Sequence, residues 1–216
     1  MRPASLAPLP ALRCPAPAAR PPVPGARCPV CLSIILPMTR VARLVLLLLL
    51  ARWSWLFLVW PMRQDVIGAS FLHLVSLPFH EAGHVILAPF GRFVSVLGGS
   101  LFQVLVPVAC WIAFSTRHPD PWGRVVSAWW TGQNACDVAL YVNDARALRL
   151  VLLGGRTGAE VEGHDWEYLL GRLGLLAQDH RLAWVLHALG ALLMLLALAW
   201  GVRLLLAGDE ATDPSW

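Results

Sequence analysis

The sequence of residues 182–206 is LAWVLHALGALLMLLALAWGVRLLL, in which Arg203 is the only charged residue. A helix needs about 20 consecutive apolar residues to cross the hydrocarbon core of a bilayer, which is about 30 Å thick. This stretch meets that requirement without interruption. It therefore predicts a transmembrane helix near the end of the chain.

Four further apolar stretches precede it, at residues 44–60, 66–90, 93–115 and 124–142. The chain of 216 residues is 57% hydrophobic and 14% charged, whereas soluble domains have about a quarter of charged residues. We therefore expect an all-α, polytopic helical membrane protein with about five transmembrane segments. Gly98 and Gly99 interrupt the third stretch, which could begin as a re-entrant loop instead of a full helix.

The two ends of the chain differ from this apolar centre. Residues 1–38 are rich in Pro, Ala and Arg, a composition that predicts a disordered tail. An alternative is that translation starts at Met38, which would leave residues 1–37 untranslated. Residues 39–208 would then form the helical membrane domain, and residues 209–216 an acidic tail. The net charge of +4 comes from scattered arginines, so we expect a lipid bilayer and no nucleic acid as partner.

One motif inside the second stretch carries chemistry: His80-Glu81-Ala82-Gly83-His84. Two histidines four residues apart lie on the same face of a helix and can share a metal ion. Glu81 then lies beside the metal, where it can take a proton from a bound water whose pKa zinc lowers to about 7. Ionisable groups inside an apolar segment are costly and are kept mainly when they pair or bind something. We therefore expect a Zn²⁺ site with His80 and His84 as ligands and Glu81 as the catalytic base of a hydrolase.

A catalytic zinc site usually has three protein ligands and a water, so a third ligand must approach the two histidines. Asp137 is expected there, because it lies in the fourth stretch at the same depth as His84. The alternative third ligand is His164, in the loop sequence Gly163-His164-Asp165-Trp166. This loop could fold back over the site, where His164 could also donate a proton to the leaving group.

Two other polar residues receive structural interpretations. Asp144 is followed by Arg146, and the two are expected to form a surface ion pair. His73 lies seven residues before His80 on the same helix face, so it is expected to support or pack against the ligands.

The motif His80-Glu81-Ala82-Gly83-His84 in an apolar segment resembles the site-2 protease family of intramembrane zinc metalloproteases. The stretch Gly98-Gly99-Ser100-Leu101-Phe102-Gln103 resembles the glycine-rich sequence that follows the motif in that family. The family takes its third zinc ligand from an aspartate in an Asn-Pro-x-x-x-x-Asp-Gly context. The counterpart here, Gly132-Gln133-Asn134-Ala135-Cys136-Asp137, lacks the proline and the final glycine.

The resemblance implies a membrane-embedded zinc metalloprotease that hydrolyses peptide bonds by Glu-assisted attack of a zinc-bound water. Its substrate would be a membrane protein or peptide, positioned by Asn134 or Gln133. It would be a multi-pass protein of the bacterial inner membrane. Metal-assisted hydrolysis follows from the residues themselves, whereas the peptide substrate follows from the resemblance.

Three other functions are compatible with parts of this pattern. The same metal and base could serve a membrane zinc hydrolase that acts on a lipid or another non-peptide substrate. A non-catalytic membrane protein could hold a structural zinc with four protein ligands, for example with both Asp137 and His164. An ion transporter would use the buried acids, but the sequence has no internal repeat of the kind found in many transporters.

Overall fold

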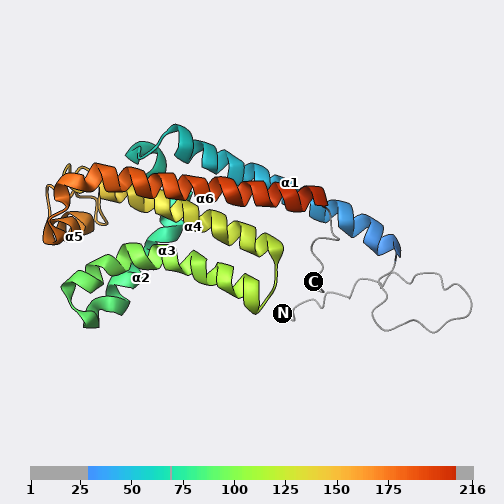
Figure 1. Cartoon of the computed structure of the whole chain (residues 1–216), viewed down its shortest axis with the longest axis horizontal. Helices are drawn as coiled ribbons and strands as arrows, with labels where there is room; N and C mark the ends of the chain where they lie inside the picture. The colour runs from blue at the N-terminus through green and yellow to red at the C-terminus, as the bar shows by residue number, and fades with distance from the viewer. Residues whose placement is uncertain (1–28, 69, 208–216) are drawn as a thin grey trace, which may run out of the picture. The chain divides into compact units, whose positions relative to one another are not determined.

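The computed structural model describes residues 29–68 and 70–207 of the chain (Figure 1). The expected all-α class is confirmed, since the described residues form helices joined by loops, with one isolated antiparallel bridge between Val151 and Thr157. The helices are α1 (Pro29–Val59), α2 (Phe71–Leu87), α3 (Arg92–Thr116), α4 (Pro121–Asn143), α5 (Asp165–Leu173) and α6 (Asp179–Ala207), with the single turns η1 (Gln64–Gly68), η2 (Ala88–Phe90) and η3 (Leu176–Gln178).

Helix α1 begins before residue 38, where the N-terminal tail was expected to end. The rest of that tail and the acidic tail at residues 209–216 lie outside the described residues. The chain divides into two compact units, Met1–Arg43 and Leu44–Trp216. The second unit contains residues 44–59 of α1, all the other helices and the motif.

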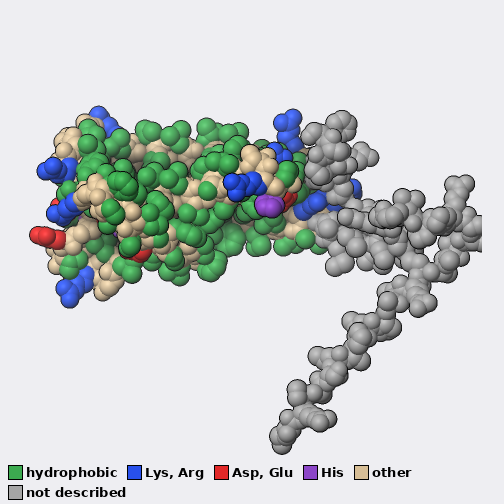
Figure 2. All heavy atoms as spheres, turned by 90° about the horizontal axis from the view of Figure 1, so that it is seen from below, with side chains coloured by type: hydrophobic (Ala, Val, Ile, Leu, Met, Phe, Trp, Pro, Cys, Tyr) green, Lys and Arg blue, Asp and Glu red, His purple; other side chains and the backbone are tan. Residues whose placement is uncertain are grey.

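Three of the described helices are long and apolar enough to cross a membrane: Arg40–Val59, Arg92–Thr116 and Leu176–Ala207. Helices α2 and α4 occupy the second and fourth predicted segments, but α2 has 17 residues and α4 carries many buried polar groups. On the face shown in Figure 2, hydrophobic side chains cover the middle of the bundle and charged side chains gather near its ends. This distribution suits a lipid environment.

The helices around the motif approach each other at glycines. Gly83 of α2 and Gly98 of α3 touch so closely that a Cβ atom added to Gly83 would lie 2.1 Å from the carbonyl oxygen of Gly98. The expectation of a re-entrant loop at Gly98 and Gly99 is therefore wrong. Helix α3 is continuous through both residues, because the glycines serve close helix packing and not a break in the helix.

Helices α4 and α6 lie side by side (Figure 1) and meet in the same way at Gly132 and Gly190. Buried side chains from α1 complete this core, which includes Leu50, Phe57, Trp129 and Met194. The indole Nε1 of Trp129 donates a hydrogen bond of 2.8 Å to the hydroxyl oxygen of Ser54, so the polar end of this buried ring has a partner.

The segment between α4 and α6 folds back on itself and ends in the short helix α5. Arg146 forms an ion pair with Asp179 at the start of α6, with an Nη2–Oδ1 distance of 2.7 Å. The expected pairing of Asp144 with Arg146 is therefore wrong. Asp144 instead accepts hydrogen bonds from the backbone N–H groups of Arg149 and Leu150, which turns the chain just beyond α4.

The contact between α4 and α6 gives a first prediction. In Gly132→Ala, the new Cβ would lie 2.6 Å from the Gly190 carbonyl oxygen, and backbone atoms cannot move away as a flexible side chain would. We expect the free energy of unfolding in detergent to fall by about 1–3 kcal/mol, the usual cost of overpacking. Gly68→Ala is the matched control, because its Cβ would meet its nearest neighbour at 3.7 Å. Equal stability of the two variants would contradict the packing described above.

Candidate metal centre

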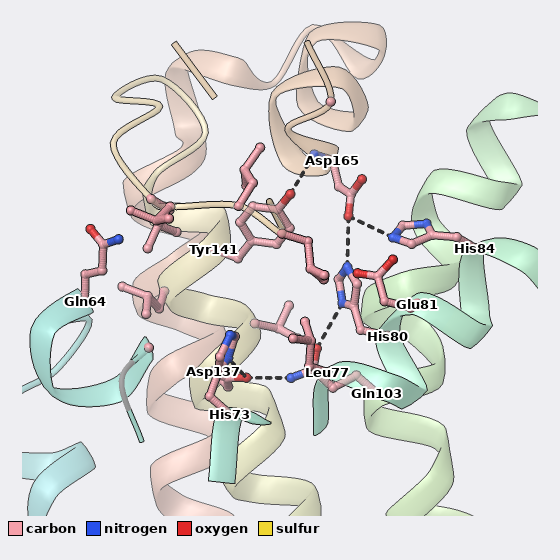
Figure 3. Close-up of a pocket in the computed structure, with 18 of the residues that line it drawn as sticks. Gln64, His73, Leu77, His80, Glu81, His84, Gln103, Asp137, Tyr141 and Asp165 are labelled. Atoms are coloured by element: carbon pink, nitrogen blue, oxygen red, sulfur yellow. Dashed lines mark hydrogen bonds and ion pairs between the residues drawn. The ribbon is translucent and has the colours of Figure 1, made fainter. Parts of the chain in front are cut away.

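The motif helix α2 presents its polar residues to one large cavity. Ser70 caps the start of the helix by accepting a hydrogen bond from the backbone N–H of His73. From there His73, His80, Glu81 and His84 all line a cavity of about 1090 Å³ (Figure 3). The rings of His80 and His84 lie edge to face, with centroids 4.8 Å apart. The predicted spacing of four residues thus brings both imidazoles to the same place.

A carboxylate from α5 meets these two imidazoles. The Oδ2 atom of Asp165 lies 3.0 Å from His80 Nε2 and 3.2 Å from His84 Nε2. Figure 3 shows the carboxylate reaching both rings from the opposite wall of the cavity. Asp165 therefore occupies the place that the sequence analysis assigned to Asp137 or His164.

Hydrogen bonds on the far side of each ring orient the two imidazoles. His80 Nδ1 lies 3.1 Å from the side-chain oxygen of Gln103, and His84 Nδ1 lies 2.9 Å from the backbone oxygen of Ser95. Carbonyl oxygens only accept hydrogen bonds, so each Nδ1 carries a hydrogen. In a neutral ring, Nε2 then presents a lone pair, the arrangement found in metal-bound histidines.

Two lone pairs and a carboxylate at one point repel one another unless a cation lies between them. That cation could be a proton shared with an imidazole or a metal ion. Burial alone would raise the pKa of Asp165, but an imidazole of His80 or His84 that carries a hydrogen on Nε2 donates it to this carboxylate, and this larger effect holds the pKa below its ordinary range. Asp165 is therefore a charged carboxylate that requires a positive partner.

The backbone of α3 leaves room for an ion at this point. A Cβ atom added to Gly99 would lie 2.5 Å from His84 Nε2 and 2.6 Å from His80 Nε2. Glycine at position 99 therefore keeps the α3 side of both Nε2 atoms free of a side chain. Any larger residue there would crowd the two nitrogens, whereas the residues present leave them open to a metal ion.

Glu81 lies next to this space but is exposed to the cavity. Ligand atoms of His80, Glu81 and His84 all lie within 4.8 Å of one another. The carboxylate of Glu81 can therefore act on a molecule bound beside the ion, or join the ion as a further ligand. Its exposure favours the first role, because a residue that must exchange protons needs access to water.

Several contacts hold Asp165 over the motif. The backbone N–H of Asp165 donates to the hydroxyl of Tyr141 at 3.1 Å. His164, which is 1% exposed, caps α5 by accepting from the N–H of Glu167, while its Nε2 lies 3.4 Å from Asp144 Oδ2. Partial burial would raise the pKa of Asp144, but the contact with His164 and the backbone hydrogen bonds outweigh it and lower this pKa. The predicted fold-back of this loop is confirmed, but His164 faces Asp144 instead of the two imidazoles.

The other predicted residues lie away from the two Nε2 atoms. Asp137 contacts His73 Nδ1 at 3.0 Å and Gln103 Nε2 at 2.6 Å. Asn134 is fully buried and donates to the backbone oxygen of Trp130, and Gln133 is fully buried as well. Among the described residues that line the cavity, neither of these two amides is present, so the structure gives no support for their expected role in substrate positioning.

Sequence reasoning missed Asp165 as the residue that meets both histidines. The signal was present, because Asp165 follows His164 directly in the loop that was expected to fold back. A carboxylate is as good a ligand for zinc as the neighbouring histidine.

A comparison of the chain with protein-family models, curated proteins and solved structures finds no match in any of the three.

The space beside Gly99 gives a second prediction. In Gly99→Ala, a methyl group would occupy the position between the two Nε2 atoms and the α3 backbone. We expect binding of Zn²⁺ or Co²⁺ to be lost, as measured by metal analysis of the purified protein. Gly171→Ala is the control, because nothing lies within 4 Å of a Cβ at that helical position. Full metal content in a folded Gly99→Ala variant would show that this space is not a metal site.

Proposed function

We propose that this protein is a membrane-embedded zinc metalloprotease, with the metal held by His80, His84 and Asp165. The observation that carries the proposal is the convergence of His80 Nε2, His84 Nε2 and Asp165 Oδ2 at one point beside Glu81. Two imidazoles and one carboxylate form a ligand set that zinc uses in catalytic sites. Zinc, when bound, supplies Lewis-acid chemistry: it polarises a carbonyl group and lowers the pKa of a water to about 7.

The protein's own residues then have separate roles. Glu81 is the general base that removes a proton from the attacking water, because its carboxylate faces the cavity next to the two histidines. Gln103 and the Ser95 carbonyl orient the histidines from behind. Tyr141 and His164 keep Asp165 in place from the other side of the cavity.

A catalytic role is favoured over a structural one by the open side of the site. Structural zinc sites are closed by four protein ligands, whereas catalytic sites leave a position for water or substrate. Here the site lies in the wall of a large cavity, and Glu81 is exposed to it. A buried site with four inward-facing ligands would have had no such access.

A peptide substrate of membrane origin fits the cavity walls. Apolar side chains surround the polar residues there, including Leu74, Leu77, Val138, Leu140 and Leu150. Three helices of the described part of the chain are long and apolar enough to cross a bilayer, and this supports a substrate segment that lies in the same membrane. The motif's resemblance to the site-2 protease family supports the same substrate class.

The role of Glu81 gives a third prediction. Glu81→Gln keeps the size of the side chain and removes its basicity, so we expect the zinc content to stay unchanged. Hydrolysis should fall by about 10²–10⁴-fold, the usual contribution of a general base. The measurement is mass spectrometry of a panel of model transmembrane peptides incubated with the protein in detergent micelles. Wild-type cleavage rates in Glu81→Gln would exclude this mechanism, whereas loss of zinc would make Glu81 a fourth ligand.

The choice of third ligand gives a fourth prediction. Asp165→Asn removes the charge between the two imidazoles. Loss of a residue that only hydrogen-bonds to a metal ligand lowers metal affinity by roughly 10–100-fold, and we expect zinc affinity to fall by more than this. Asp120→Asn is the matched control, because Asp120 caps α4 and asparagine caps helices equally well. Competition with a chelator measures the zinc affinity of the wild type and of both variants. An Asp165→Asn variant with the affinity of the control would remove Asp165 from the site.

A further inference from the structure

A chain of buried polar side chains connects the metal centre to α4. Asp137 of α4 accepts a hydrogen bond of 2.6 Å from the amide nitrogen of Gln103 in α3. The amide oxygen of Gln103 lies 3.1 Å from His80 Nδ1 in α2. These three residues are 4%, 5% and 8% exposed respectively, so water does not compete for their hydrogen bonds. Figure 3 shows the chain running from Asp137 through Gln103 to His80.

The direction of each hydrogen bond follows from the acceptor at the end of the chain. A carboxylate offers only acceptor atoms, so Gln103 must turn its NH₂ group towards Asp137. Its oxygen then faces His80, and this oxygen also only accepts. This oxygen is satisfied when Nδ1 of His80 carries the hydrogen, and that tautomer leaves the Nε2 lone pair for the metal.

Asp137 is held in its acceptor role by a second donor. His73 Nδ1 lies 3.1 Å from Asp137 Oδ1 and 3.0 Å from Asp137 Oδ2. A buried carboxylate is costly unless donors surround it, and His73 and Gln103 are the donors here. His84 differs from His80, because its Nδ1 partner is the backbone oxygen of Ser95, which no side-chain substitution removes.

We propose that Asp137 is a positioning residue that acts through Gln103 to keep His80 in the Nδ1–H tautomer, with Nε2 directed at the metal. The proposal rests on the metal centre of the proposed function and not on the peptide substrate. It gives Asp137 a role different from the one expected from the sequence, where it was a ligand itself. The buried charge of Asp137 then acts on the metal site through two hydrogen bonds, from Gln103 to Asp137 and from His80 to Gln103.

A reversal of the hydrogen bond between residues 103 and 137 tests this proposal. In Gln103→Glu, two carboxylates face each other across a 2.6 Å contact. At a pH high enough that they no longer share a proton, we expect His80 to lose its orientation and zinc affinity to fall by about 10–100-fold. In the double variant Gln103→Glu with Asp137→Asn, the new amide donates to the new carboxylate, which still accepts from His80 Nδ1. We expect this variant to recover most of the affinity. Asp137→Asn alone keeps an acceptor oxygen for Gln103 and should lose little.

The tautomer itself can be read without metal or substrate when every protein compared also carries Asp165→Asn, because the Asp165 carboxylate, 3.0 Å from His80 Nε2, would otherwise compete for the ring hydrogen. ¹⁵N NMR of histidine-labelled protein in micelles distinguishes Nδ1–H from Nε2–H rings, and a His80→Gln variant assigns the His80 signal. The measurement is made at pH 10, above the ordinary imidazole pKa of about 6.5. We expect Nδ1–H in the wild type and the double variant. Gln103→Met, which is apolar and of similar size, should show a mixture and covers the case that Gln103→Glu does not fold.

Two results would overturn the proposal. If Asp137→Asn loses zinc as completely as Asp165→Asn and the double variant does not recover it, Asp137 is a ligand. If the His80 tautomer is the same in the wild type and Gln103→Met, the chain does not set it. Failure of the proposed function looks different, because a wild-type protein without zinc affinity or peptide hydrolysis can still show the tautomer change.

Discussion

The meeting of two imidazoles and a carboxylate at one point is the interaction on which the rest of the site depends. His80, His84 and Asp165 come from two helices that are far apart in the sequence, and their facing atoms are all acceptors once the two Nδ1 atoms carry hydrogen. Such a group is unstable in apolar surroundings without a positive charge. The surrounding residues act either to supply the space for that charge or to hold the acceptors against their mutual repulsion.

Close helix packing supplies the space. Gly83, inside the motif, lies against Gly98, and this contact brings the α3 backbone next to the histidines. The next residue, Gly99, then faces both Nε2 atoms. A larger residue at position 83 or 98 would push α3 away and widen the space, while one at 99 would fill it. The glycines that looked like a break in an apolar segment thus define both the helix contact and the size of the site.

The sequence predicted the part of the site that lies on one helix. His80 and His84 could be placed together because helical periodicity relates residues four apart. The glycine-rich stretch was also identified, but its helical structure was not, because glycine at a close helix contact and glycine in a loop give the same composition. Likewise, apolar stretches alone do not distinguish five spanning segments from the three helices of the described residues that are long and apolar enough to span, since α4 carries polar residues that are buried by its neighbours.

The residues that join distant parts of the chain were harder to predict. Asp137 was favoured as a ligand because of its depth in an apolar segment, and it is indeed buried with polar partners. The position of a residue along an apolar segment does not determine on which side of the helix its side chain lies. Asp165 is separated from His80 by 85 residues. Its position depends on the loop before α5, which is held by the contact of His164 with Asp144 and by the hydrogen bond from the Asp165 N–H to Tyr141.

These contacts show that one helix, α4, organises the site without supplying a ligand. Asp137, Tyr141 and the capping residue Asp144 follow one another at intervals of four and three residues, so they share one face. Asp137 holds Gln103, Tyr141 holds the backbone of Asp165, and Asp144 holds His164 at the start of α5. Helix α4 also packs closely along α6 at Gly132 and Gly190, and this contact holds α4 in place. The two halves of the candidate metal centre, on α2 and on α5, are therefore aligned through this face of α4.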